Sequence, residues 1–377
     1  MRISCLQENL KRGLATVIPA VAGKSTLPVL SNVLLATDGG RLKLAATNLE
    51  IGITSWIGAK VEEEGAITIP AKLLSDVVGG LPNDRVTLTL DARTQTLRVE
   101  CARFTSNIKG IEADDFPTIP TAADRDATVS LPPDLLREAI ERVAFAAATD
   151  DSRPVLAGVL IRLRDSSATF AAADGFRLAT RIIPLPLPVS TAYDCIVPAR
   201  ALSDLARIVG DSESPVRMTI TPQGSQVLFH TEHAELVSRL IDGKFPDFER
   251  IIPARYTTRT VLDTAELAKA VKLASFFASA SQQVVKLTIE SGGDIGPGRL
   301  IISANAAEVG DNTGEIDGMV VGEGGQIALN VKYLGEALAA MKTAQIALET
   351  QSAQSPGVFK PVGQEGYIHI IMPMSIR

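Results

Sequence analysis

The sequence predicts an α+β protein made of three copies of one domain, each with two helices packed on antiparallel sheets. Three observations lead to this fold class. A set of motifs occurs three times, helical apolar spacing recurs twice in each copy, and alternating runs of β-forming residues lie between the helices. A chain of 377 residues has room for three domains of ordinary size.

The repeat is long and keeps its order. The first copy has LPVLSNV at 27–33, LAATN at 44–48 and IPAK at 69–72. The second has RPVLAGV at 153–159, AAADG at 171–175 and VPAR at 197–200, and a weaker third copy has QQVV at 282–285, ISAN at 302–305 and LNVK at 329–332. Solenoid units repeat every ~20–50 residues, so copies this far apart are whole domains. We place the domains at 1–120, 121–254 and 255–377.

Each copy has helical signals at matching places. Leu6, Leu10, Leu14 and Val17 follow helical spacing, and Pro19 ends that segment. The counterparts are 133–147 and 264–278, and a second helix starts at residues 71, 199 and 331.

The strands are indicated by alternation. In the runs 86–90 and 96–101, apolar residues occupy every second position, as in a half-buried strand, and Gly-rich turns separate such runs. Strands therefore dominate each copy, and the sheets are expected to be antiparallel.

Composition indicates the type of core and the cellular compartment of the protein. Apolar residues make up 46% of the chain and aromatic residues only 4%, so the cores must be aliphatic. Three well-separated cysteines are not typical of a disulfide framework. The first residues show no signal peptide, and no apolar run approaches 20 residues, so we expect a cytoplasmic protein without a membrane partner.

Motifs that could indicate catalysis fail on inspection. GKST at 23–26 lacks the first glycine of a phosphate-binding loop and follows a helix rather than a strand. His230 and His233 would point to opposite faces of a strand, which argues against a metal site. No serine or cysteine has a histidine nearby in the sequence that would mark it as a nucleophile. We therefore predict no catalytic residues, metal or cofactor, and a protein that is not an enzyme.

Several motifs together resemble the bacterial β sliding clamp family, the processivity subunit of DNA polymerase III. They are TLPVLSN at 26–32, ADGFRL at 173–178, DGKFPDF at 242–248 and IMPM at 371–374, and the resemblance covers the whole chain. It implies the DNA clamp fold and a head-to-tail homodimer closed into a six-domain ring around double-stranded DNA of any sequence. It also implies that short peptide motifs tether DNA polymerase III alpha, clamp-loader subunits and other replication and repair polymerases.

The net charge of −6 is unusual for a DNA-binding protein, but the predicted helices carry two more basic than acidic residues. A modest excess suits a ring that slides, because tight phosphate pairing would hold it in place. The predicted DNA-binding residues are the family-matched Lys24 and helix residues Lys11, Arg12, Lys72, Arg137, Arg142, Arg200, Arg207, Lys269 and Lys332.

The resemblance also implies a partner-peptide pocket between the second and third domains. Its matching residues are Leu156, Gly175, Phe176, Arg177, Leu178, Pro246, Arg250, Ile251, Asn330, Tyr333, Ser355, Met372, Pro373 and Met374. We expect an adaptable apolar slot with arginines at its edge that hold polar groups of the peptide. Phe176 replaces a polar residue of some family members, and the ending 375–377 also departs from the usual one.

Phe104, Phe276 and Phe277 match dimer-interface positions of the family. Two other readings stay open: a clamp paralogue or repeat scaffold that binds partner peptides without a role in replication, and an enzyme of unknown type.

Overall fold

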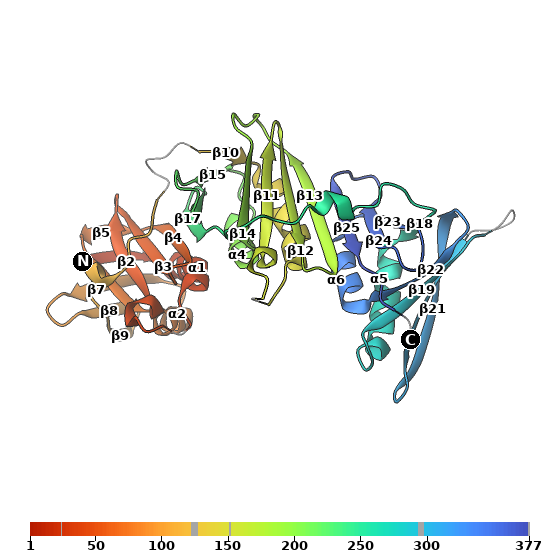
Figure 1. The fold of residues 1–377 in the computed structure, drawn as a ribbon. Coiled ribbons are helices and arrows are strands. Elements are labelled where there is room, and N and C mark those ends of the chain that lie inside the picture. The colour runs from red at the N-terminus through yellow and green to blue at the C-terminus, as the bar shows by residue number, and fades with distance from the viewer. Residues whose placement is uncertain (24, 122–126, 151, 293–297, 376–377) are drawn as a thin grey trace. The chain divides into compact units, whose positions relative to one another are not determined.

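The computed structural model describes residues 1–23, 25–121, 127–150, 152–292 and 298–375. Two compact units make up the chain (Figure 1). The first contains Met1–Arg137 and Ala201–Leu240, and the second contains Glu138–Arg200 and Ile241–Arg377. The second repeat therefore contributes strands to both units.

The first unit holds a five-stranded sheet in the order β5-β1-β7-β8-β9 and an eight-stranded sheet in the order β10-β15-β16-β17-β4-β3-β2-β6. Its strands are β1 (Arg2–Leu6), β2 (Asn32–Asp38), β3 (Arg41–Thr47), β4 (Ile51–Gly58), β5 (Lys60–Glu63), β6 (Ala66–Pro70), β7 (Arg85–Asp91), β8 (Thr96–Cys101), β9 (Phe104–Lys109), β10 (Val129–Leu131), β15 (Val216–Ile220), β16 (Gln226–His230) and β17 (Ala234–Arg239).

The second unit holds a twelve-stranded sheet in the order β14-β11-β12-β13-β25-β24-β23-β18-β21-β20-β19-β22. Its strands are β11 (Gly158–Arg164), β12 (Ser167–Ala173), β13 (Arg177–Pro184), β14 (Tyr193–Pro198), β18 (Thr258–Asp263), β19 (Val284–Glu290), β20 (Gly298–Ala306), β21 (Gly310–Val321), β22 (Gly325–Asn330), β23 (Gln345–Thr350), β24 (Gly357–Pro361) and β25 (Tyr367–Ile371). The named strand pairs in both units are antiparallel, as predicted.

Six α-helices lie among the described residues, two for each repeat, as predicted. They are α1 (Gln7–Val17), α2 (Ala71–Gly80), α3 (Pro133–Val143), α4 (Ala199–Val209), α5 (Thr264–Ala278) and α6 (Val331–Ala340). The second helices begin at the predicted residues, and α5 matches its predicted range. The helix predicted over 133–147 is shorter, because a 3-10 turn, η4 (Ala144–Ala146), follows α3.

Local sequence explains how these helices start and pack. Asp263 accepts the amide hydrogen of Glu266 at 2.9 Å and so caps α5. On α1, Gly13 lets the helix approach the sheet closely, since a Cβ there would lie 2.5 Å from Leu44 Cδ1. Gln7 donates to the Val78 carbonyl at 2.7 Å and ties α1 to the last turn of α2.

Both units contain a junction between repeats, and the two junctions share one pairing scheme. In the first unit, β4 pairs with β17 and places Ser55 opposite Ala234. In the second, β13 pairs with β25 and places Arg181 opposite Tyr367 at the corresponding position. The two junctions therefore differ in the size and charge of the side chains between the strands.

His369 lies in the second junction, opposite Ala179 on β13. It is fully buried, and neither ring nitrogen has a hydrogen-bond partner among the described residues. Its ring stacks on Phe145, with centroids 5.6 Å apart. Burial, together with the positive charge of Arg177, lowers the pKa of His369 to about 3. Leu236 occupies the corresponding register position in the first junction, opposite Ile53.

The buried imidazole predicts a loss of stability in acid. Between pH 6.5 and about 3 the unfolded chain binds a proton that the folded chain does not, so stability falls as the pH falls through this window. We expect His369→Leu to reduce the drop in the urea midpoint between pH 7 and pH 4.5. The control His233→Leu, which changes an imidazole that is 74% exposed, should leave the drop in place. An equal drop in His369→Leu and the unchanged chain would contradict this account.

Candidate DNA and peptide interfaces

Most of the basic residues predicted to face DNA are solvent-exposed on the helices. Those whose side chains are exposed are Lys11, Arg12, Lys72, Arg200, Arg207, Lys269 and Lys332. Arg137 is half-buried, and its guanidinium pairs with Asp211 at 2.7 Å. Lys24 lies outside the described residues. The exposed basic residues are spread over helices of all three repeats.

The structure contradicts the predicted DNA contact of Arg142. Its side chain is 3% exposed, and its guanidinium contacts the Glu138 carboxylate at 3.0 Å and the Gln364 side-chain oxygen at 2.9 Å. The guanidinium also lies over the Tyr367 ring, 5.3 Å from its centroid. Glu138 further pairs with Arg181 at 3.3 Å. We predicted a DNA contact because Arg142 is a basic residue on a helix. The Tyr367 side chain of β25 covers its guanidinium, so this prediction is wrong.

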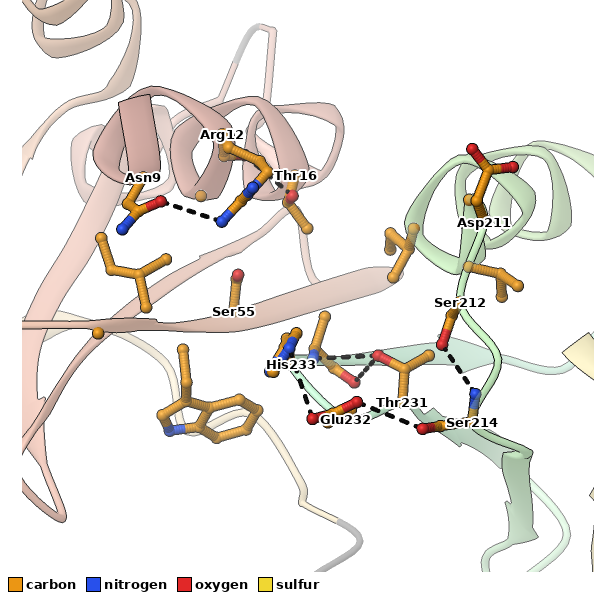
Figure 2. Close-up of a pocket in the computed structure, with 18 of the residues that line it drawn as sticks. Asn9, Arg12, Thr16, Ser55, Asp211, Ser212, Ser214, Thr231, Glu232 and His233 are labelled. Atoms are coloured by element: carbon orange, nitrogen blue, oxygen red, sulfur yellow. Dashed lines mark hydrogen bonds and ion pairs between the residues drawn. The ribbon is translucent and has the colours of Figure 1, made fainter. Parts of the chain in front are cut away.

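The first unit has a cavity of about 780 Å³ where the second has this arginine network (Figure 2). Thr16 of α1 and Ser55 of β4 line it, at positions that correspond to Arg142 and Arg181. Figure 2 shows Asn9, Arg12 and Thr16 on one side, with Ser55 below them. The residues on the other side are Asp211, Ser212, Ser214, Thr231, Glu232 and His233. Arg12 donates to Asn9 at 3.0 Å. Basic residues on one wall and acidic residues on the other leave the cavity without one dominant charge.

The two histidines examined for metal binding have separate carboxylate partners. His230 contacts Glu235 at 2.8 Å, and the exposed His233 contacts Glu232 at 3.7 Å. Across the described residues, no group of three or more His, Cys, Asp or Glu side chains is placed to hold a metal ion.

The predicted peptide residues all belong to the second unit, and two of them are part of one apolar cluster. Leu156 and Leu178 belong to this cluster and are 8% and 2% exposed. Phe245 and Phe248 pack edge to face beside them, with ring centroids 6.4 Å apart. The predicted residues Pro246, Arg250 and Ile251 are exposed in the following segment. An apolar floor beside exposed apolar and basic side chains is suited to a short peptide.

The C-terminal segment is fixed to both the second and the third repeat. The Met372 amide donates to the Phe176 carbonyl at 2.8 Å, and the Met374 amide donates to the Ala328 carbonyl at 2.8 Å. Pro373 lies between these bonds, where its missing N–H leaves no donor unpaired. Met372 remains 38% exposed. The tail thus presents a flexible thioether side chain on a fixed backbone.

The start of α6 supplies further predicted residues. Asn330 accepts the amide hydrogens of Lys332 at 2.9 Å and Tyr333 at 3.2 Å, so it acts as the helix N-cap. Burial, reinforced by the negative charge of Asp174, raises the pKa of Tyr333. Ser355 is half-buried, and its hydroxyl lies 2.9 Å from that of Ser352.

The structure also contradicts the predicted position of Arg177. We expected it at the pocket edge, but it is 7% exposed. Its Nε lies 3.1 Å from Asp174, Nη1 pairs with Glu336, and Nη2 donates to the Phe145 carbonyl at 2.6 Å. The guanidinium also stacks on Tyr333, 4.4 Å from the ring centroid. With its donors occupied in this way, Arg177 holds α6 and the 174–177 turn in place, whereas Arg250, with 86% of its side chain exposed, remains at the surface.

Sequence reasoning missed Arg153, Phe145 and Glu336 as parts of this site. Arg153 donates to the Asp174 carbonyl at 2.9 Å, and its guanidinium lies beside Gly175. A buried arginine requires a carboxylate partner. Glu336, however, is 159 residues from Arg177 in the sequence, and no local pattern connects them.

The aromatic residues predicted at a dimer interface differ in exposure. Phe104 on β9 is 59% exposed and Phe276 on α5 is 63% exposed, whereas Phe277 is half-buried. Neither Phe104 nor Phe276 belongs to the core of its own unit, so each is available for contact with another chain.

Three family models together match nearly the whole chain. They describe the N-terminal domain of the DNA polymerase III beta subunit at residues 1–120, its central domain at 130–247 and its C-terminal domain at 249–375. The chain belongs to the DNA polymerase III beta subunit family.

Relatives that align with the chain over nearly the full length of both are beta sliding clamps. A beta sliding clamp of Synechocystis sp. is 33% identical, and one of Bacillus subtilis is 28% identical, with at least 99% of each chain covered. Some solved structures align with this chain over the full length of both. They include a sliding clamp of B. subtilis (27% identity, TM-score 0.92) and one of Pseudomonas aeruginosa bound to griselimycin (28% identity, TM-score 0.90).

The three clamp domains and the α+β fold are therefore confirmed, and so is the prediction that this is a sliding clamp rather than an enzyme. The scaffold without a role in replication is not favoured, because the curated relatives and the solved structures are sliding clamps. No helix in the described part of the chain is long and apolar enough to cross a membrane.

Proposed function

We propose that two copies of this chain close head to tail into a ring around duplex DNA in the cytoplasm and tether polymerases to it. The observation that carries the proposal is the match of all three beta-subunit domain models, in order, along one chain. We assign the domains to 1–120, 121–254 and 255–377. In this arrangement the paired helices of each domain face the DNA, and retention comes from topology.

The charges support retention without tight binding. Exposed basic residues such as Lys11 and Arg12 occur on the helices, but the chain as a whole has a net charge of −6. Few phosphate contacts release few counterions, so direct affinity for DNA should be low and should fall with salt. A closed ring would stay on circular DNA regardless.

We propose that the site over the Leu156 and Leu178 cluster binds short, extended peptides containing Leu and Phe. DNA polymerase III alpha, clamp-loader subunits and other replication and repair polymerases would carry such motifs. Because each chain has one such site, their peptides should compete for it. The apolar floor, the exposed Met372 and the surface arginine Arg250 support this assignment.

The mechanism predicts topology-dependent retention. Protein loaded on nicked circular DNA should remain bound through a wash at high salt and should be released when the circle is cut. The measurement is gel filtration of DNA-bound protein before and after linearisation. Replacing Lys11 and Arg12 with serine should weaken loading. It should also reduce the slope of log affinity against log salt concentration by the contribution of ~2 phosphate contacts, without affecting release on cutting. Equal retention on linear and circular DNA would contradict encirclement.

A further inference from the structure

Phe176 presents an exposed ring on a rigid backbone. Asp174 Oδ1 accepts the amide hydrogens of Phe176 at 2.8 Å and Arg177 at 3.0 Å. The Phe176 carbonyl accepts the Met372 amide hydrogen at 2.8 Å. The backbone is thus held on both sides, yet the ring is 60% exposed, which is uncommon for phenylalanine.

The first repeat contains the same turn and serves as an internal control. Asn48 Oδ1 accepts the amide hydrogens of Glu50 at 3.0 Å and Ile51 at 2.8 Å. The Glu50 carbonyl accepts the Arg239 amide hydrogen at 2.9 Å. Between them, Leu49 has a positive φ of 74°. Each of these hydrogen bonds has its counterpart in the second repeat, where Gly175 has a φ of 95°.

The two equivalent turns show which side chains their hydrogen-bonded geometry requires. At the first junction, the backbone hydrogen bond that joins the turn to β17 links two charged residues, Glu50 and Arg239. At the second junction, the equivalent hydrogen bond links Phe176 and Met372, both exposed. Since the turn forms with charged residues, its geometry does not require the aromatic ring or the thioether. Both lie beside the proposed peptide site.

We propose that Phe176 and Met372 form a platform that selects partner peptides with an aromatic residue next to their anchoring Leu and Phe residues. This inference rests on the proposed peptide site and names the partner chemistry it prefers. An aromatic side chain gains an offset or edge-to-face contact with the Phe176 ring and a sulfur contact with Met372. Because the hydrogen bonds already fix the backbone, little further order is lost on binding.

The test is calorimetry with peptides that share the Leu/Phe anchor and differ at one flanking residue. Tryptophan or serine is placed on each side of the anchor in turn. At one flank, the unchanged chain should bind the tryptophan peptide about 3- to 10-fold tighter than the serine peptide, the range expected for an aromatic pair. Phe176→Ser should abolish this preference, so that the tryptophan and serine peptides bind with equal affinity. Glu50→Ser, at the equivalent turn, is the matched control and should preserve the preference.

The outcomes separate the platform from the peptide site itself. Because the ring is exposed, Phe176→Ser should keep the thermal midpoint of the unchanged chain. Equal affinity of the unchanged chain for tryptophan and serine peptides, or a preference that survives Phe176→Ser, would overturn the platform alone. Failure of every peptide to bind the unchanged chain would overturn the peptide site and the platform together.

Discussion

Replacing Phe276 with alanine is expected to convert the proposed dimer into monomers near the 39.9 kDa chain mass. The ring is 63% exposed in the single chain, so burial against a second chain would supply most of its stabilising contact. Truncating a fully buried phenylalanine costs about 3–5 kcal/mol, which raises the dimer dissociation constant at least ~100-fold. Sedimentation velocity over a concentration series measures the shift.

The exposed fraction of each side chain determines which residues are useful probes and controls for the dimer interface. Phe104→Ala should act in the same direction, since that ring is 59% exposed. Phe277 is a poorer probe, because it is half-buried and packs near Gly310 within its own unit. Leu187→Ala is the control, as Leu187 is 76% exposed and matches no predicted interface position. If Phe276→Ala sediments as an unchanged dimer, Phe276 does not belong to the interface.

Removing residues 372–377 is expected to abolish peptide binding while leaving the dimer and DNA retention intact. The deletion removes the exposed Met372 side chain and the backbone bonds from Met372 and Met374. It begins after β25 ends at Ile371, so the sheet pairing of β25 is retained. Calorimetry with a Leu/Phe peptide measures the binding, and sedimentation measures the dimer.

A shorter truncation provides the matched control. A chain ending at Met374 keeps both backbone hydrogen bonds and should bind the peptide as the full chain does. Met372→Ala alone should weaken binding by roughly 1–3 kcal/mol, as the loss of an interface anchor does. Undiminished binding to the chain that lacks residues 372–377 would place the peptide site elsewhere.

The sequence by itself determined the repeat and its elements. Apolar spacing located the six helices, and alternation located strands such as β7 and β8, because both patterns reflect which side of an element is buried. Leu156, Leu178 and Met372 were assigned to the proposed peptide site because they occur within recognisable motifs. Exposure of Phe104 and Phe276 agrees with their predicted contact role, which sedimentation has yet to test.

Only the tertiary structure decided what the arginines do. We expected both Arg142 and Arg177 to contact a partner molecule, yet the turn before β25 brings Gln364 to Arg142, and helix α6 brings Glu336 to Arg177. These partners lie 222 and 159 residues away, and the register of the β13–β25 pairing creates that junction. A local pattern records which face of an element is apolar. It does not record which distant strand covers a charged residue, because that depends on how the repeats join.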